Sequence, residues 1–131
     1  MKNLANCSKL KVLSKNETKK LEKMFQLQKK FASRFFVMED MTQEQKVSLT
    51  KEYLHCIYNE CEEIKNWIPW KHWKKPYVVT KKIEKEIKME IIDVWHFLMD
   101  LALVWGMTPQ EFFDFYMAKQ NENINRQKKG Y

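Results

Sequence analysis

The residues TKKIEKEIKMEIIDVWHFLMDLALVWG, numbered 80–106, decide the fold. Apolar side chains recur here every three or four residues, which is the repeat of one face of an α-helix. They are Ile83, Ile87, Ile91, Val94, Leu98, Leu101 and Trp105. From Ile91 onward the stretch is apolar nearly all round, and Gly106 is a suitable C-terminal stop. The pattern predicts one long helix from about Thr80 to Gly106.

Three more helices are predicted around it. The first is expected from Lys15 to Val37, with a capping box that starts at Ser14, and the second from near Thr42 to about Asn66. The fourth starts at Thr108, with Glu111 as the partner of the cap. Only two Gly and three Pro are present, which argues against a turn-rich β fold. We therefore predict an all-α, four-helix bundle. Its last three helices carry apolar residues on more than one side, so we expect a homodimer to complete it.

The composition is typical of one globular domain with a basic surface. The chain has 131 residues, 44% of them hydrophobic, and a formal net charge of +7. We expect one domain over 15–131, after a basic segment at 1–14. The charge would attract nucleic acid, acidic membranes or nucleotide phosphates without choosing among them. No apolar run is long enough to span a bilayer, and residues 1–11 lack the core of a signal peptide, so we expect a cytoplasmic protein without a membrane partner. Reduced thiols are expected at Cys7, Cys56 and Cys61.

Two acidic pairs carry the main functional prediction. Glu60 and Glu63 are three residues apart, as are Glu90 and Asp93, so each pair shares one helical face beside apolar residues. Burying several carboxylates together is costly unless they take up protons or are neutralised, and Mg²⁺ prefers oxygen ligands. The pattern alone fits equally well two amphipathic helices whose acids lie at the solvent boundary. Asp93 and His96 also hint at a di-iron bundle, but that chemistry needs a Glu-x-x-His on each of two helices.

An aromatic and basic loop follows the second predicted helix. It contains Trp70, Lys71, Trp73 and Lys74. Indole rings stack on bases and lysines meet phosphates, which favours a nucleotide pocket. The same indoles would serve equally well to plug the end of the bundle.

Other polar residues stand out by their position. Gln28 is the one polar member of the apolar face of the first predicted helix. Lys119, Asn123 and Arg126 follow a spacing of four and then three, which places them on one face of the fourth helix. Arg126 suits two-pronged contact with phosphate, although a solvated helix end would show the same pattern.

Five segments together match a known family pattern. They are Met24–Gln28 (MFQLQ), Asn59–Glu63 (NECEE), Pro69–Lys74 (PWKHWK), Met89–Phe97 (MEIIDVWHF) and the tail Lys119–Tyr131. In this order they resemble the dimeric, all-helical dUTPases, relatives of the MazG-like nucleotide pyrophosphatases. The acidic pairs alone would indicate only the wider superfamily, whereas the WKHWK loop and the RQ-x-x-GY ending are more specific.

The resemblance implies an enzyme that hydrolyses dUTP, and also dUDP, and so removes dUTP from the nucleotide pool. The bond between the α and β phosphates would be cleaved to give dUMP and pyrophosphate. The Mg²⁺ cofactor, for which Mn²⁺ can substitute, would be held by Glu60, Glu63, Glu90 and Asp93. Either Glu60 or Glu63 would take the proton of the attacking water. The uracil would contact Gln28, Trp70 and Trp73. The sugar and phosphates would contact Lys71, Lys74, Lys119, Asn123 and Arg126.

Two alternative functions remain open on the sequence. The first keeps the metal site and changes the substrate to dCTP or a broader set of nucleotides. The second is a helical nucleic-acid-binding protein, which the net charge of +7 would suit. The second alternative leaves the acidic pairs unexplained, because carboxylates repel phosphate unless a metal intervenes. We therefore expect a deoxyuridine nucleotide as the partner rather than nucleic acid.

Overall fold

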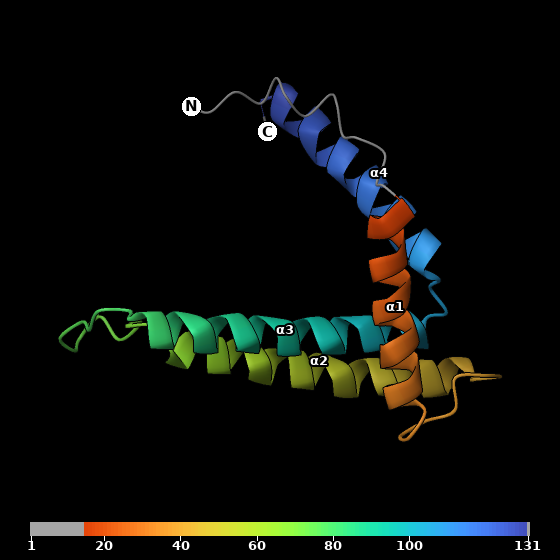
Figure 1. Cartoon of the computed structure of the whole chain (residues 1–131), viewed down its shortest axis with the longest axis horizontal. Coiled ribbons are helices and arrows are strands. Elements are labelled where there is room, and N and C mark those ends of the chain that lie inside the picture. The colour runs from red at the N-terminus through yellow and green to blue at the C-terminus, as the bar shows by residue number, and fades with distance from the viewer. Residues whose placement is uncertain (1–14, 131) are drawn as a thin grey trace.

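The computed structural model describes residues 15–130, which form four α-helices and no strand within that range (Figure 1). The helices are α1 (Lys15–Ala32), α2 (Gln43–Asn66), α3 (Lys81–Val104) and α4 (Pro109–Lys128). Figure 1 shows α2 and α3 side by side as a long antiparallel pair, with α1 crossing the pair near one end and α4 leading away from it. The predicted all-α, four-helix class is confirmed. The predicted basic segment 1–14 and the Ser14 cap lie outside the described residues.

The predicted caps fix where two of the helices begin. At α2, the Gln45 backbone N–H donates to Thr42 Oγ1 (3.2 Å), and the Thr42 backbone N–H donates to Gln45 Oε1 (2.9 Å). The same reciprocal pair joins Thr108 and Glu111 at α4, at 3.1 Å in both directions. Each box satisfies two backbone donors that have no partner inside the helix.

The first helix ends earlier than the sequence predicted, at Ala32 instead of Val37. The Ser33 hydroxyl donates to the carbonyl oxygen of Lys30 (2.8 Å), the acceptor that would continue the helical ladder. The Arg34 and Phe35 backbone N–H groups bond three residues back instead of four. Side-chain competition for a backbone acceptor thus unwinds the helix although the apolar spacing continues.

The third helix ends close to the predicted glycine. Gly106 has φ 73°, a left-handed conformation that costs glycine little because it has no Cβ. This turn lets the Gly106 N–H reach the Leu103 carbonyl (3.0 Å) and the Met107 N–H reach the Ala102 carbonyl (2.9 Å). The bonds form a Schellman motif, which turns the chain out of α3 toward α4.

The buried core lies where α1, the end of α3 and the start of α4 meet. Phe25, Met99 and Ala102 form its centre, and the partly buried Leu21, Leu103, Met107 and Phe112 pack against them. Phe25 and Phe112 meet edge to face, with ring centroids 5.5 Å apart. This contact joins α1 to α4 and fixes α1 across the α2–α3 pair, which brings Gln28 next to α3.

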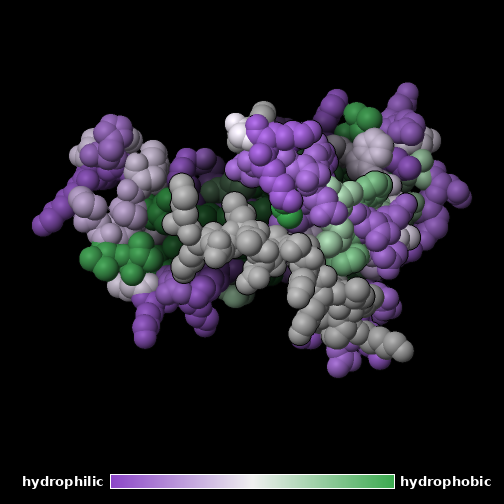
Figure 2. All heavy atoms as spheres, turned by 90° about the horizontal axis from the view of Figure 1, so that it is seen from above, coloured by the Kyte–Doolittle hydropathy of each residue, from purple (hydrophilic) through white to green (hydrophobic). Residues whose placement is uncertain are grey.

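The α2–α3 pair leaves much apolar surface uncovered within one chain. No residue of α2 is buried, and α3 exposes the large side chains of Ile91, Trp95 and Leu98. Figure 2 shows apolar side chains at the surface among hydrophilic ones on the face in view. None of the described helices is by itself long and apolar enough to cross a bilayer; only α3 and α4 taken together, bent by 108° at their junction, pass by length and composition.

Candidate metal centre and base cavity

Three of the four predicted metal-binding carboxylates converge between α2 and α3. Oxygens of Glu60, Glu90 and Asp93 lie within 4.8 Å of one another, and all three residues are partly buried. Loss of solvent raises the pKa of the Glu60 carboxyl above its usual 4.5, and the charges of Glu63, Asp93 and Glu90 raise it further. A cation bound among these carboxylates would offset the repulsion between their charges.

The donor set fits a hard divalent cation. Three carboxylates offer only oxygen ligands, which Mg²⁺ and Mn²⁺ prefer. Within residues 15–130 this is the one group of three or more His, Cys, Asp or Glu residues that is placed to hold a metal ion. His96 Nδ1 lies 3.7 Å from Asp93 Oδ1, next to the cluster and outside it.

Glu63 lies outside this convergence. It is exposed and accepts a hydrogen bond from the Asn59 amide, Nδ2 to Oε1, at 3.0 Å. Glu63 shares the helical face of Glu60, so its charge is close enough to raise the pKa of Glu60. In this conformation Glu63 borders the cluster and leaves the other three carboxylates to form it.

A residue of the loop contacts the cluster directly. Trp67, at the C-terminal cap of α2, donates a hydrogen bond from indole Nε1 to Glu90 Oε1 at 3.2 Å. A donor of this kind holds a metal-binding carboxylate in one orientation.

A cavity of about 440 Å³ opens beside the cluster. Its lining comes from α1, α2 and α3 and consists of Leu27, Gln28, Phe31, Glu60, Asp93, His96, Phe97 and Asp100. Glu60 and Asp93 of the cluster thus form part of the lining, and the rest combines three apolar side chains with Gln28, His96 and Asp100. A pocket with an apolar lining and a few convergent polar groups is the usual form of a small-molecule site.

Gln28 is held inside this cavity by Asp100. The two side chains are only 8% and 5% exposed, and Gln28 Nε2 donates to Asp100 Oδ1 at 2.8 Å. Burial raises the pKa of Asp100, whereas the hydrogen bond from Gln28 and the nearby His96 oppose that shift. The bond joins α1 to α3 at the edge of the core.

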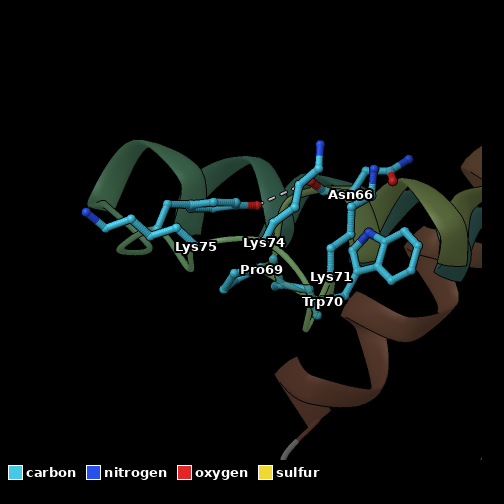
Figure 3. A pocket seen from close by; sticks show the side chains of 8 residues that line it. Asn66, Pro69, Trp70, Lys71, Lys74 and Lys75 are labelled. Atoms are coloured by element: carbon cyan, nitrogen blue, oxygen red, sulfur yellow. Dashed lines mark hydrogen bonds between the residues drawn. The ribbon is translucent and has the colours of Figure 1, made fainter.

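Three of the predicted loop residues, Trp70, Lys71 and Lys74, line a different cavity. This second cavity, of about 230 Å³, is lined by Asn66, Ile68, Pro69, Trp70, Lys71, Lys74, Lys75 and Tyr77. Figure 3 shows the side chains of Trp70 and Lys75 on opposite sides of the loop. The Lys71 ammonium lies 5.3 Å from the centre of a Trp70 ring, and Trp73 meets Trp70 edge to face at 5.7 Å. In the described part of the chain, none of these residues lines the cavity that contains Gln28.

The predicted phosphate-binding residues of α4 are also apart from the cluster. Lys119 Nζ lies 2.8 Å from Glu122 Oε2, and Arg126 pairs with the same glutamate. Asn123 is exposed, and α4 leads away from the α2–α3 pair (Figure 1). One chain thus assembles the acidic cluster and Gln28 without these three residues.

A comparison with protein-family models matches residues 20–112 to the family described as dUTPase. The match covers 93 of 131 residues and includes the acidic cluster, Gln28 and the loop. This chain belongs to the dUTPase family.

Curated relatives of this dUTPase-family chain come from phages. A dCTP pyrophosphatase of Enterobacteria phage LZ5 is 42% identical over 71 residues, covering 47% of this chain and 41% of the relative. A dCTP pyrophosphatase of Enterobacteria phage T4 is 30% identical over 106 residues, covering 65% of this chain and 62% of the relative. A T4 DNA replication protein is 28% identical over 100 residues, covering 60% of this chain and 26% of the relative. The chain thus spans less than two thirds of each of these relatives, and no solved structure matches it.

Sequence reasoning missed two polar residues of the candidate site. Asp100 lies in the apolar run that ends α3, two turns after Asp93, and an acid in such a run is a signal that could have found it. Trp67 gave no comparable signal, because its hydrogen bond to Glu90 depends on how the loop leaves α2.

Proposed function

We propose that this chain is a Mg²⁺-dependent pyrophosphatase of pyrimidine deoxynucleoside triphosphates, with dUTP and dCTP as its substrates. The observation that carries the proposal is the convergence of Glu60, Glu90 and Asp93 at the wall of the cavity that contains Gln28. The family match supports dUTP and, by the same chemistry, dUDP. The two phage relatives named dCTP pyrophosphatases support dCTP, so both bases belong to the proposal.

The reaction is hydrolysis at the α-phosphorus. Water attacks that phosphorus, the bond to the oxygen bridging the β-phosphate breaks, and pyrophosphate leaves with that oxygen. When bound, Mg²⁺ supplies positive charge that offsets the charge developing on the phosphates. Glu60, Glu90 and Asp93 hold it, with Glu63 beside them.

Glu63 is the better placed of the two glutamates proposed to accept the proton of the attacking water. Its oxygens are outside the converging three, and Asn59 holds one of them. A carboxylate outside the converging three is available to a water molecule, so we assign the proton to Glu63 rather than to Glu60.

The base and the phosphates are assigned to different regions. Gln28 contacts the base edge, Trp70 and Trp73 line the base site, and Lys71 and Lys74 contact the sugar and phosphates. Lys119, Asn123 and Arg126 bind sugar and phosphate. None of these loop and α4 residues lines the cavity in the described part of one chain, so in the proposed homodimer a second copy brings them there. Free deoxynucleotides as substrates also place the protein in the cytoplasm.

The test is pyrophosphate release from dUTP, dCTP, dTTP and dATP, with and without Mg²⁺. Release from dUTP and dCTP that requires the metal is expected. If no pyrophosphate is released from any of the four nucleotides, the proposed enzymatic activity is wrong. If dATP is hydrolysed at the same rate, the proposed preference for pyrimidine bases is wrong. Sedimentation of the chain at twice 16.1 kDa is expected for the homodimer.

The remaining alternative, nucleic-acid binding, predicts a different result. It requires salt-sensitive binding of DNA without Mg²⁺. The clustering of three carboxylates disfavours it, because they repel a phosphate backbone unless a cation is bound.

A further inference from the structure

The hydrogen bond between Gln28 and Asp100 is unusual for its position. Both residues lie at the edge of an apolar core, 72 residues apart in the chain, and both are nearly fully buried. A buried carboxylate costs free energy unless it is well bonded. Two apolar residues would pack there without that cost, so this polar pair calls for a role beyond packing.

We propose that Asp100 is a positioning residue, which turns the carbonyl oxygen of Gln28 toward the cavity so that it accepts a hydrogen bond from an N–H of the base of a bound pyrimidine nucleotide. This inference rests on the proposed function and names the group that reads the base. Asp100 does not touch the nucleotide and acts through Gln28.

The chemistry of the two side chains fixes the orientation. An ionised carboxylate only accepts hydrogen bonds, so the amide end that faces it must be the NH₂ group. Gln28 Oε1 then takes no part in the bond to Asp100. No buried side-chain nitrogen or oxygen in the described part of the chain lacks a hydrogen-bond partner. Because the one bond recorded for the Gln28 side chain is made by Nε2, its oxygen keeps access to the cavity that it lines.

An acceptor at this place suits both proposed substrates. Cytosine presents the N–H of its 4-amino group and uracil presents N3–H on the edge opposite the sugar. A single fixed acceptor serves either donor, which explains how one site takes both bases. The second N–H of Gln28 Nε2 remains available for the acceptor next to that donor in the same direction along the edge, which is N3 of cytosine, or O2 of a uracil shifted by one position.

Replacing Asp100 by Asn tests the orientation with little change in shape. An asparagine offers both a donor and an acceptor, so Gln28 loses its preference between its two orientations. We expect the dissociation constants of dCMP and dUMP, measured by calorimetry with Mg²⁺, to rise about three- to tenfold, as for one lost hydrogen bond. The KM for dCTP and dUTP should rise in parallel, with kcat within about twofold.

The Asp114→Asn variant is the matched control. Asp114 accepts a bond from Gln110 Nε2 at 2.9 Å, the same pair of side chains on the exposed surface of α4. It should bind both nucleotides as the unmodified chain does. A double-mutant cycle adds a readout that a merely structural role would not give: in a Gln28→Ala background, Asp100→Asn should have no further effect on binding.

A swap of the two groups gives a rescue. In Gln28→Glu combined with Asp100→Asn, the asparagine donates to the glutamate, whose second oxygen still offers an acceptor to the base. The double variant should bind dCMP more tightly than Gln28→Glu alone, in which two carboxylates oppose each other.

The outcomes separate this inference from the proposed function. Unchanged nucleotide binding in Asp100→Asn, or an equal loss with and without Gln28, would overturn the positioning role and leave the pyrophosphatase intact. If the chain binds dCMP but hydrolyses no nucleotide, the proposed pyrophosphatase activity is wrong. The double-mutant cycle of Gln28 and Asp100, measured by dCMP binding, still decides the role of Asp100. Absence of any nucleotide binding would overturn both.

Discussion

The indole N–H of Trp67 donates a hydrogen bond to Glu90, 3.2 Å from Nε1 to Oε1. The bond ties the loop after α2 to the acidic cluster between α2 and α3. The loop and the proposed metal site therefore influence each other, because a shift of Trp67 releases one of the three carboxylates.

Replacing Trp67 by Phe should weaken metal binding. The substitution keeps an aromatic ring and removes the N–H that orients Glu90. We expect the Mg²⁺ concentration for half-maximal activity to rise about tenfold, as for other partners of metal-binding carboxylates. Trp105→Phe is the control, because that indole donates to the Thr50 hydroxyl instead (3.0 Å). If both variants needed the same Mg²⁺ concentration for half-maximal activity, the hydrogen bond from Trp67 to Glu90 would have no role in metal binding.

Replacing Asp93 by Asn should lower activity and raise metal-free stability. One ligand is lost, so pyrophosphate release should fall at least about a hundredfold. One like charge also leaves the cluster, so the Tm without Mg²⁺ should rise by about 3 °C. Glu62→Gln, which alters an exposed glutamate paired with Lys65, should change neither quantity. A drop in the metal-free Tm of Asp93→Asn would contradict the proposed repulsion between the three carboxylates.

The pH dependence of stability should change sign with the metal. The raised pKa of Glu60 means that the fold holds this proton more tightly than the unfolded chain does. Without Mg²⁺ the contribution of Glu60 to the free energy of unfolding should therefore fall as pH rises from about 4.5 through the raised pKa. With Mg²⁺ it should rise, because the cation binds the deprotonated carboxylates. Thermal melts across this pH range check both slopes, and Glu60→Gln should flatten the metal-free one.

Truncating Phe25 should destabilise the whole fold. Phe25 is 3% exposed and joins α1 to Phe112 of α4. Phe25→Ala should lower the free energy of unfolding by about 3–5 kcal/mol, measured by urea denaturation. Phe35→Ala, at a side chain that is 69% exposed, should stay within about 0.5 kcal/mol. If the two variants had similar midpoints of urea denaturation, Phe25 would not be part of the stabilising core.

Local signals in the sequence predicted the helices well. Thr42 and Thr108 are caps whose partners lie three residues away, so no tertiary information was needed. The early end of α1 was missed because the spacing of Phe31 and Phe35 continues past the bond from Ser33 that stops the helix.

Helical spacing alone predicts the site only where residues share a helix, whereas the grouping of Glu60 with Glu90 and Asp93 was implied by the family resemblance. Glu90 and Asp93 are one turn apart, so their common face follows from the helical repeat. The pairing of Gln28 with Asp100 crosses 72 residues and depends on where α1 crosses α3, which no periodicity reveals. The separation of Trp70 from the Gln28 cavity likewise depends on the path of the loop.

The absence of any buried residue in α2 has a consequence for how the protein survives dilution. In the proposed homodimer, the partner's surface supplies the burial that this helix lacks. Unfolding and dissociation are then coupled in one step, in which a folded dimer becomes two unfolded chains. The melting temperature should then climb with protein concentration. At protein concentrations well below the dissociation constant of the dimer, the chain would lose its structure and its activity together. The concentration of the protein would then control its activity.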